Sequence, residues 1–368
     1  MRVLRFFALF AIVSTSMWAA EPVGWLRYPA ISWDGRLIAF TYMGDLYRVP
    51  AEGGRAVQLT TNDAQEAMPI WSHDGKWIAF SSDRNGNFDV FVMPAEGGPA
   101  RRLTSHSAPE WPSGFSHDDQ YVIFSGWRGT APASRAFPHD ELPQLYRVPT
   151  LGGPVELVLS TPAEAATESV DGRWLAYHDK KGVENPWRKH HASSIARDVW
   201  VYDAVEKTHR RVTDFGGEDR NPVISSDGRW IYFLSEAPGS FNVFRIPFVG
   251  GTASPLTSFT THPVRSLTVS RDDALCYGYD GAIYTQRVGA APQRVEITVV
   301  RDRGRDEERR LSLSNGVGEV SAAPGGKELA FTIRGQIFVV PSEGGAARRV
   351  SQDAGPHRDV SFTPDGKA

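Results

Sequence analysis

One short turn sequence recurs along the whole chain and limits what the chain can fold into. An Asp-Gly dipeptide, or a degenerate copy of it, returns every 40 to 56 residues. A fixed structural unit repeated at this interval is typical of solenoids, propellers and arrays. The copies are Asp34-Gly35, Asp74-Gly75, Asp118-Asp119, Asp171-Gly172, Asp227-Gly228, Asp272-Asp273, Gly325-Gly326 and Asp365-Gly366.

The residues after each turn predict two paired strands. The first strand carries large apolar residues two positions apart with a small one between them, as in Ile38, Ala39 and Phe40, which is typical of a strand packed closely on both faces. The second strand ends at a proline, which cannot donate to a ladder, and a glycine pair follows that permits a tight hairpin. These prolines are Pro50, Pro94, Pro149, Pro247 and Pro341, and the glycine pairs begin at Gly53, Gly97, Gly152, Gly250 and Gly344.

With a short strand before each turn and another after each glycine pair, every repeat holds four strands. Four antiparallel strands at this interval predict a blade of a β-propeller, because one such sheet cannot cover its own apolar faces and must stack on its neighbours. We therefore predict an all-β chain: a six-bladed β-propeller of four-stranded antiparallel blades over residues 21–298, followed by the truncated start of a second propeller. A charged connector at 299–316 precedes the first blade and partial second blade of that propeller, at 317–368.

Composition and the N-terminus narrow the setting. A net charge of −3 argues against a protein that binds nucleic acid by bulk electrostatics, and one cysteine, Cys276, excludes an intrachain disulfide. Residues 1–20 resemble a secretory signal peptide, with Arg2 and Arg5 before an apolar run and Ala19-Ala20 at its end. We expect a periplasmic or otherwise exported protein. An uncleaved anchor is the alternative, because Trp18 stands where a small residue is usual.

Sequence motifs for catalysis are scarce. The chain holds no Gly-x-Ser-x-Gly elbow, no His-Glu-x-x-His helix and no Cys-x-x-Cys pair. The run Asp83–Asp89 superficially resembles a calcium loop, but its glycine is fourth rather than sixth, so we predict an ordinary turn. We predict no catalytic residue, no metal site and no cofactor. Trp77, Trp174 and Trp230 recur in register, which indicates packing between blades, and Cys276 is expected to be a buried apolar thiol.

The insert of the fourth repeat leaves three interpretations open. His190-His191, with His178 and Asp179 nearby, could supply metal ligands, contacts to a substrate or partner domain, or purely structural interactions. Ser193 and Ser194 with these histidines and Asp198 suggest a catalytic triad on paper, but closeness in sequence is poor evidence for triad geometry.

Two stretches of the chain resemble known families. The blade pattern Pro-x-x-Ser-x-Asp-Gly-Lys/Arg-x-Ile-Ala-Phe is similar to the repeat of TolB-like and tricorn-type propellers. The run from His178 to Asp203, followed by Gly217–Pro222, resembles more specifically the bacterial exported tricorn-type serine peptidases. The resemblance implies that a seven-bladed propeller, a PDZ domain and catalytic domains with the serine and histidine follow, and that the propellers filter and conduct peptides.

We accordingly predict the non-catalytic propeller region of such a peptidase, with peptides and the downstream propeller, PDZ and protease domains of the same chain as partners. The alternatives are a TolB-like envelope scaffold that binds proteins, and the propeller of a prolyl-oligopeptidase-like or amidohydrolase-fused enzyme. No nucleic acid is expected as a partner, nor any membrane beyond the signal peptide, and the oligomeric state stays open. The residues expected to contact peptide or a neighbouring domain are Trp187, Arg188, His190, His191 and Arg197.

Overall fold

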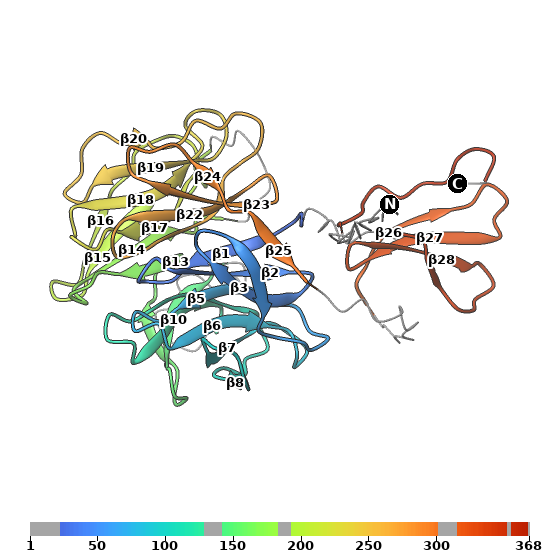
Figure 1. Cartoon of the computed structure of the whole chain (residues 1–368), viewed down its shortest axis with the longest axis horizontal. Helices are drawn as coiled ribbons and strands as arrows, with labels where there is room; N and C mark the ends of the chain where they lie inside the picture. Colours follow the sequence, from blue (N-terminus) through green and yellow to red (C-terminus); the bar gives the residue numbers. More distant parts are fainter. Residues whose placement is uncertain (1–22, 129–141, 183–192, 301–314, 352–354, 367–368) are drawn as a thin grey trace, which may run out of the picture.

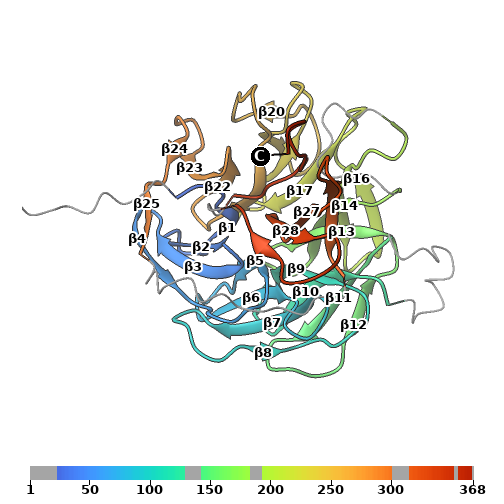
Figure 2. The same cartoon turned by 90° about the vertical axis from the view of Figure 1, so that its right-hand side faces the viewer.

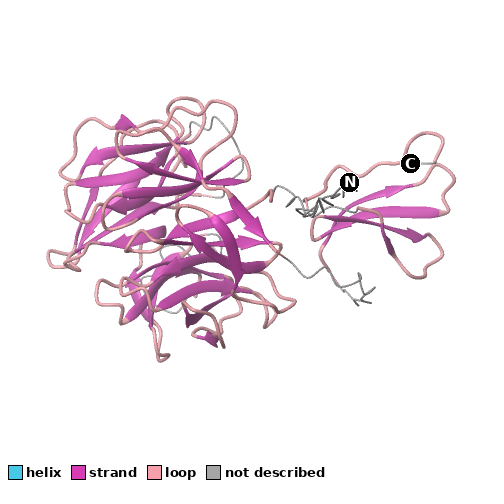
Figure 3. Cartoon of the chain, in the orientation of Figure 1, coloured by secondary structure: helices cyan, strands magenta, loops and turns pink. Residues whose placement is uncertain are grey.

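The computed structural model describes residues 23–128, 142–182, 193–300, 315–351 and 355–366. Throughout these ranges the secondary structure consists of strands and turns (Figure 3). Within the same ranges, no helix has the length and apolarity needed to cross a membrane.

Six four-stranded antiparallel sheets, each built from consecutive strands, stand around a common axis. The first strands lie near the centre and the fourth strands at the periphery (Figure 2). This arrangement confirms the predicted β-propeller. The strands are β1 (Arg27–Ile31), β2 (Leu37–Tyr42), β3 (Asp45–Pro50) and β4 (Gly54–Gln58); β5 (Glu66–Trp71), β6 (Trp77–Ser82), β7 (Asp89–Pro94) and β8 (Arg101–Arg102); β9 (Glu110–Phe115), β10 (Tyr121–Gly126), β11 (Gln144–Pro149) and β12 (Glu156–Leu159); β13 (Ala163–Glu168), β14 (Trp174–Asp179), β15 (Val199–Asp203) and β16 (Thr208–Arg211); β17 (Asp219–Ile224), β18 (Trp230–Ser235), β19 (Asn242–Pro247) and β20 (Ser254–Pro255); β21 (Arg265–Val269), β22 (Ala274–Tyr279), β23 (Ala282–Arg287) and β24 (Gln293–Arg294).

The second strand of each blade is the most buried element of the ring. In β2, Ile38, Ala39 and Phe40 are completely buried, as the repeat predicts for a strand covered on both faces. Phe40 pairs with Tyr47 on β3, and their rings stack 5.7 Å apart. Burying a side chain of this size contributes about 1.5–3 kcal/mol, so the aromatic columns are a main source of the ring's stability.

An irregularity recurs in the first strand of most blades. The pairing of the first and second strands shifts register there, and the residue at the shift has a positive φ although it is not glycine. A β-bulge of this kind bends the strand and turns a side chain away from its regular position. The residues concerned are Tyr28, Met68, Ala165, Asn221 and Ser266.

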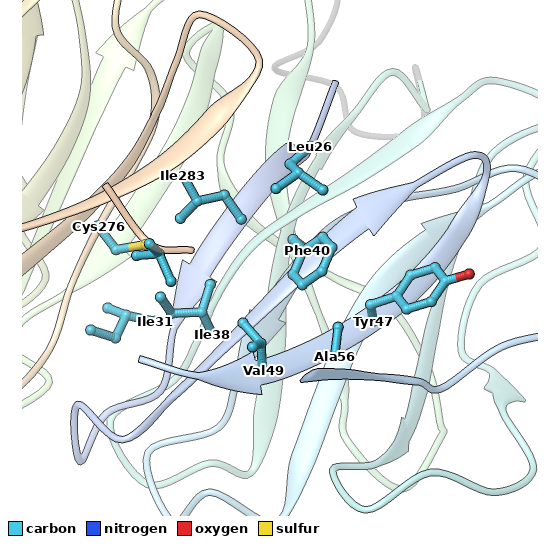
Figure 4. Packing of buried hydrophobic residues seen from close by; sticks show 10 residues of the cluster. Leu26, Ile31, Ile38, Phe40, Tyr47, Val49, Ala56, Cys276 and Ile283 are labelled. Atoms are coloured by element: carbon cyan, nitrogen blue, oxygen red, sulfur yellow. The ribbon is translucent and has the colours of Figure 1, made fainter. Parts of the chain in front are cut away.

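Contacts between the sixth and first blades close the ring. Each of these two blades takes its four strands from one continuous stretch of the chain. Leu26 donates its amide to the carbonyl of Gly281 at 2.9 Å. Cys276 and Ile283 of the sixth blade share one apolar cluster with Phe40 of the first (Figure 4), which confirms the buried position predicted for the cysteine. A fifth strand, β25 (Ile297–Val299), then adds to the outer edge of the first blade in parallel with β4. It includes Val299, one residue beyond the predicted end of the ring.

Side chains and backbone groups at the Asp-Gly turns link neighbouring blades in a belt. His73 and Asp119 join the second and third blades at 2.8 Å, and His117 and Glu168 join the third and fourth at 3.0 Å. The belt continues from the fifth blade to the sixth through Ser226 and Arg271, and from the sixth to the first through Arg271 and Trp33. At the turn of the fourth blade the corresponding residue is Val170, which is exposed. At the Asp-Gly turns, the fourth and fifth blades therefore lack this link, and Arg210 of the fourth blade donates instead to the carbonyl of Phe248 in the fifth.

A seventh sheet follows the ring and lies beside it in Figure 1, and Arg334 Nη2 comes within 3.9 Å of Asp83 Oδ2 in the second blade. It consists of β26 (Val317–Ala322), β27 (Glu328–Ile333), β28 (Gln336–Pro341) and β29 (Arg348–Arg349). Its strand β27 is only partly buried, whereas its counterpart β6 in the ring is buried almost throughout. The same repeat therefore reaches full burial only where blades lie on both sides of it.

A glycine beside β25 offers a test of the closure. A Cβ on Gly53 would lie 2.6 Å from the carbonyl oxygen of Glu296, whereas one on Gly54 would meet nothing within 4 Å, and both residues have a left-handed φ. We expect Gly54→Ala to cost about 1–2 kcal/mol from backbone strain alone. Gly53→Ala should cost more, because β25 must also move. Urea unfolding of the two variants measures the free energy of unfolding of each. Equal losses of stability would contradict close packing of the segment at β25 against Gly53.

Candidate functional site

The two faces of the ring differ in their loops. We call the face that carries the Asp-Gly turns the turn face, and the opposite face, which carries the loops between the second and third strands of each blade, the insert face. The insert of the fourth repeat joins β14 to β15 and so belongs to the insert face. Because β25 runs parallel to β4, the chain also leaves the ring toward this face.

Of the five predicted contact residues, the structure describes one. Trp187, Arg188, His190 and His191 lie outside the described residues. Arg197 is described, and its side chain is 5% exposed. It therefore presents almost no surface to a peptide in this structure, and its surroundings show a different role.

Arg197 ties the fourth blade to the fifth. Its Nη1 lies 2.8 Å from Glu218 Oε1 and 3.2 Å from Oε2, directly before β17. Its Nε lies 3.6 Å from Glu164 Oε2 on β13, and its carbonyl accepts the amide of Asp219 at 3.0 Å. Together these contacts join the fourth blade to the fifth at the insert face, where the turn-face belt does not reach.

His178 completes the junction as a neutral side chain. Its Nδ1 accepts the backbone amide of Asn221 at 3.2 Å, so the ring proton sits on Nε2, which faces Glu164 Oε2 at 3.4 Å. Burial lowers the pKa of His178. Burial also disfavours the Glu164 carboxylate, but the hydrogen bond from His178 and the charges of Lys180 and Arg197 outweigh it and lower the pKa of Glu164. His178 is therefore a structural residue rather than a free acid or base.

The stem of the fourth-blade insert is held by a second group of charges. Asp179 Oδ1 accepts the amide of Asp198 at 2.7 Å, and its Oδ2 accepts the indole N–H of Trp200 at 3.1 Å. Lys181 Nζ donates to Asp198 Oδ2 at 2.6 Å and to the carbonyl of Ala196 at 2.6 Å. Asp198 thus pairs with a lysine, which speaks against its orienting a histidine for Ser193 or Ser194. Hydrogen bonds therefore connect the residues at which the insert begins to those at which it ends.

Buried acids stand at the start of several first strands, and they were not predicted from the sequence. Glu66 and Glu110 are completely buried, and each pairs with an arginine eighteen residues later, Arg84 or Arg128, at 2.7 Å. Asp219 is the counterpart in the fifth blade, without such an arginine. Alignment of the repeats on the Asp-Gly turns would have revealed the acid and arginine spacing as a signal.

Asp219 is the most perturbed carboxyl group of this region. Burial raises its pKa to about 7, hydrogen bonds from Ser235 and Thr213 act against this, and the charges of Asp198 and Glu218 add to it. Its Oδ1 is buried without a hydrogen-bond partner among the described residues. The insert face therefore carries a group that titrates near neutral pH.

The described side chains of this region hold the blades and the base of the insert together through hydrogen bonds and ion pairs. Within the described ranges, no three histidine, cysteine or acidic residues are arranged to hold a metal ion. The loop Asp83–Asp89 is tied into the blade, since Asp83 Oδ1 accepts the amide of Gln65 at 2.7 Å and Asp89 pairs with Arg102 at 2.6 Å. Trp77, Trp174 and Trp230 pack against the apolar clusters of the blades, as predicted.

Comparison with known proteins identifies this ring. Residues 23–291 match the model of the tricorn protease N-terminal β-propeller domain. A curated tricorn protease homolog from Streptomyces coelicolor is 26% identical over 352 residues, which cover 90% of this chain and 28% of the homolog. The chain thus spans less than a third of that relative's length.

Solved structures agree on the fold. The crystal structure of the tricorn protease superposes with a TM-score of 0.64 at 21% identity, over 90% of this chain and 32% of that one. TolB from Acinetobacter baumannii superposes with a TM-score of 0.50 at 19% identity, over 67% of this chain and 57% of that one. Likeness at these identities concerns the propeller fold alone.

The pKa of Asp219 predicts an opposite response of two aspartate variants to pH. The folded protein holds a proton on Asp219 that the unfolded chain loses above about pH 4, so the wild type loses stability between about pH 4 and 7. Asn cannot ionise, so the melting temperature of Asp219→Asn relative to wild type should rise by several degrees between pH 4.5 and 8.

Asp227→Asn is the matched control, because Asp227 is hydrogen-bonded to Ser225 at a turn and its pKa is lowered. Its difference from wild type should stay nearly constant over that range. A flat response of Asp219→Asn as well would contradict the proposed protonation.

The buried contacts of Arg197 predict a stability effect. Arg197→Met would leave the buried carboxylate of Glu218 without its partner, at a cost of about 3–5 kcal/mol in the free energy of unfolding. Arg211→Met is the control, because Arg211 is half exposed and 3.7 Å from Asp198, and should cost less than about 1 kcal/mol. Urea denaturation measures both. Similar small losses would contradict the structural role of Arg197 and restore it as a contact residue.

Proposed function

The chain belongs to the tricorn protease N-terminal β-propeller family, and from this we propose that its ring filters or conducts peptides for a serine peptidase whose catalytic domain lies outside this chain. Family membership over residues 23–291 is the observation that carries the proposal. The described residues contribute the ring, its closure and the base of the insert, and no step of peptide-bond hydrolysis is assigned to them.

The layout of the insert face supports this role. The chain leaves the ring toward the same face on which the fourth-blade insert stands. Segments that follow β25 and peptides that approach the insert would therefore share one side of the ring. The contacts of Arg197 and Lys181 hold the base of that insert, so that its own residues can act from a fixed position.

Within the insert, Trp187, Arg188, His190 and His191 remain our candidates for contact with peptide or with a neighbouring domain. Arginine and tryptophan are the residue types that most often carry binding energy at interfaces. We assign Arg197 to the support of the insert instead, because it is buried against Glu218. We thus propose that the insert makes the contacts, and that the pairing of Arg197 with Glu218 between the fourth and fifth blades supports it.

A protein-binding scaffold of the TolB kind is the second candidate function. The structural likeness to TolB from Acinetobacter baumannii favours it only at the level of the fold, since the identity is 19%. In that case the ring would bind protein partners and serve no peptidase. The two functions predict different behaviour of the natural full-length protein toward peptides.

Replacement of the insert separates these functions. In the full-length protein, residues 183–192 would be exchanged for a Gly-Ser linker of equal length, with Gly182 and Ser193 unchanged. If the insert contacts peptides, we expect kcat/KM for long peptides to fall at least tenfold. Hydrolysis of short chromogenic substrates should change less, because they make fewer contacts.

A control keeps the insert and exchanges the turn at residues 204–207, on the turn face of the same blade, for a Gly-Ser sequence of the same length. Unchanged hydrolysis of long peptides by the insert variant would contradict the contact role. Absence of any peptidase activity in the full-length protein, with partner binding retained, would contradict the proposed function and favour the scaffold.

A further inference from the structure

A cleft of about 220 Å³ opens between the fifth and sixth blades, beside their Asp-Gly turns. The fifth blade contributes Trp230, Tyr232 and Arg245, and the sixth contributes Asp272, Asp273 and Arg287. It lies on the turn face and has no part in the site described above.

Arg245 is the unusual group of this cleft. Its guanidinium carbon lies 4.2 Å from the centre of the Trp230 ring, so the cation is stacked rather than solvated on that side. No acidic side chain in the described part of the chain lies within salt-bridge distance of it, and its Nε is buried without a hydrogen-bond partner there. The Trp230 ring thus fixes the position of the Arg245 guanidinium, but no described carboxylate pairs with its charge.

Two other blades carry a paired arginine at this position: Arg147 pairs with Glu156 of its own blade, and Arg48 pairs with a residue of the next blade. Arg48 is the counterpart of Arg245, since both are the fourth residue of a third strand. Its Nη2 lies 2.6 Å from Glu96 Oε2 in the next blade, and its Nη1 lies 3.2 Å from the carbonyl oxygen of Ala95. A carboxylate that crosses the junction between blades therefore neutralises the arginine there.

The sixth blade cannot supply the same carboxylate. Glu96 is the third residue of a turn in which the amide of Gly97 bonds to the carbonyl of Pro94. In the sixth blade the equivalent bond joins Ala290 to Arg287, and the third residue is Gly289. The cleft lies where a glutamate side chain is missing.

The other acids of the cleft do not take the place of Glu96. Asp272 pairs with Arg287 at 2.7 Å, and Asp227 pairs with Arg229 at 2.7 Å. Asp273 faces Tyr232, and burial together with the charges of Asp227 and Asp272 raises its pKa. Asp34 and Asp74 occupy the corresponding turn positions of the first and second blades, where Arg48 nevertheless pairs with Glu96.

We propose that the cleft between the fifth and sixth blades binds a carboxylate carried by an acidic side chain, which takes beside Arg245 the position that Glu96 takes beside Arg48. The ligand is an aspartate or glutamate of a peptide or protein segment. The site goes beyond the proposed handling of peptides at the insert face, and it stands or falls independently of it.

The test uses the side-chain Nε–H signal of Arg245 in the NMR spectrum of the whole chain, assigned with Arg245→Lys. The probe is N-acetyl-glutamate amide, and its matched control is N-acetyl-glutamine amide, which has the same shape without the charge. We expect the glutamate probe to shift the signal in a saturable way in the millimolar range, and the glutamine probe to leave it unchanged. Arg245→Met, folded by circular dichroism, should lose this binding; because the variant lacks the arginine signal, its binding is followed by the indole N–H signal of Trp230, which lines the same cleft.

A second variant tests the internal comparison. Glu96 is mostly exposed, so Glu96→Ala should fold normally and vacate the position beside Arg48. We expect this variant to gain a second site, reported by the Arg48 Nε–H signal. N-acetyl-alanine, whose only carboxylate is terminal, distinguishes the source, and equal or tighter binding of it would overturn the assignment to acidic side chains. No saturable shift with the glutamate probe, or binding that survives in Arg245→Met, would overturn the site itself.

Discussion

The packing of each second strand between two neighbouring blades is the interaction on which the rest of this structure depends. A four-stranded sheet with apolar side chains on both faces has no stable form alone, because each face must be covered. In the ring, Ile78, Ala79 and Phe80 of β6 are completely buried. The seventh sheet repeats the pattern with Leu329, Ala330 and Phe331, of which Ala330 alone is buried to a comparable degree. The circular arrangement follows from this requirement.

Once the blades are stacked, each junction needs polar contacts of its own, and these differ around the ring. Histidine and carboxylate pairs hold two junctions at the turn face, and β25 covers the outer edge of the first blade. The fourth and fifth blades use Arg197, Glu164 and Glu218 at the insert face instead. At the fifth and sixth blades, a missing glutamate leaves Arg245 beside an open cleft. Departures from the repeat therefore mark the places where the ring can meet something other than itself.

Much of this fold could be predicted from the sequence because the repeat is local. The Asp-Gly turns, the terminal prolines and the aromatic columns specify strands and their pairing within one blade. The burial of Arg197 could not be predicted in this way, because Glu218 lies in another blade and the insert looks like an exposed loop. The same holds for β25, a three-residue strand whose partner β4 is far away in sequence. The bulges at Met68 and Ala165 also escaped prediction, because neither residue type signals a positive φ as glycine does.

Amide hydrogen exchange of the whole chain tests most directly whether stacking between blades supplies the stability. The local sequence pattern is the same in β6, β18 and β27, so only the presence of neighbouring blades distinguishes them. If stacking is decisive, the amides of β6 and β18 exchange only through global unfolding, and those of β27 exchange about a hundredfold faster or more. Equal protection of β27 and the ring strands would show that a single blade is stable by itself, and would contradict this account.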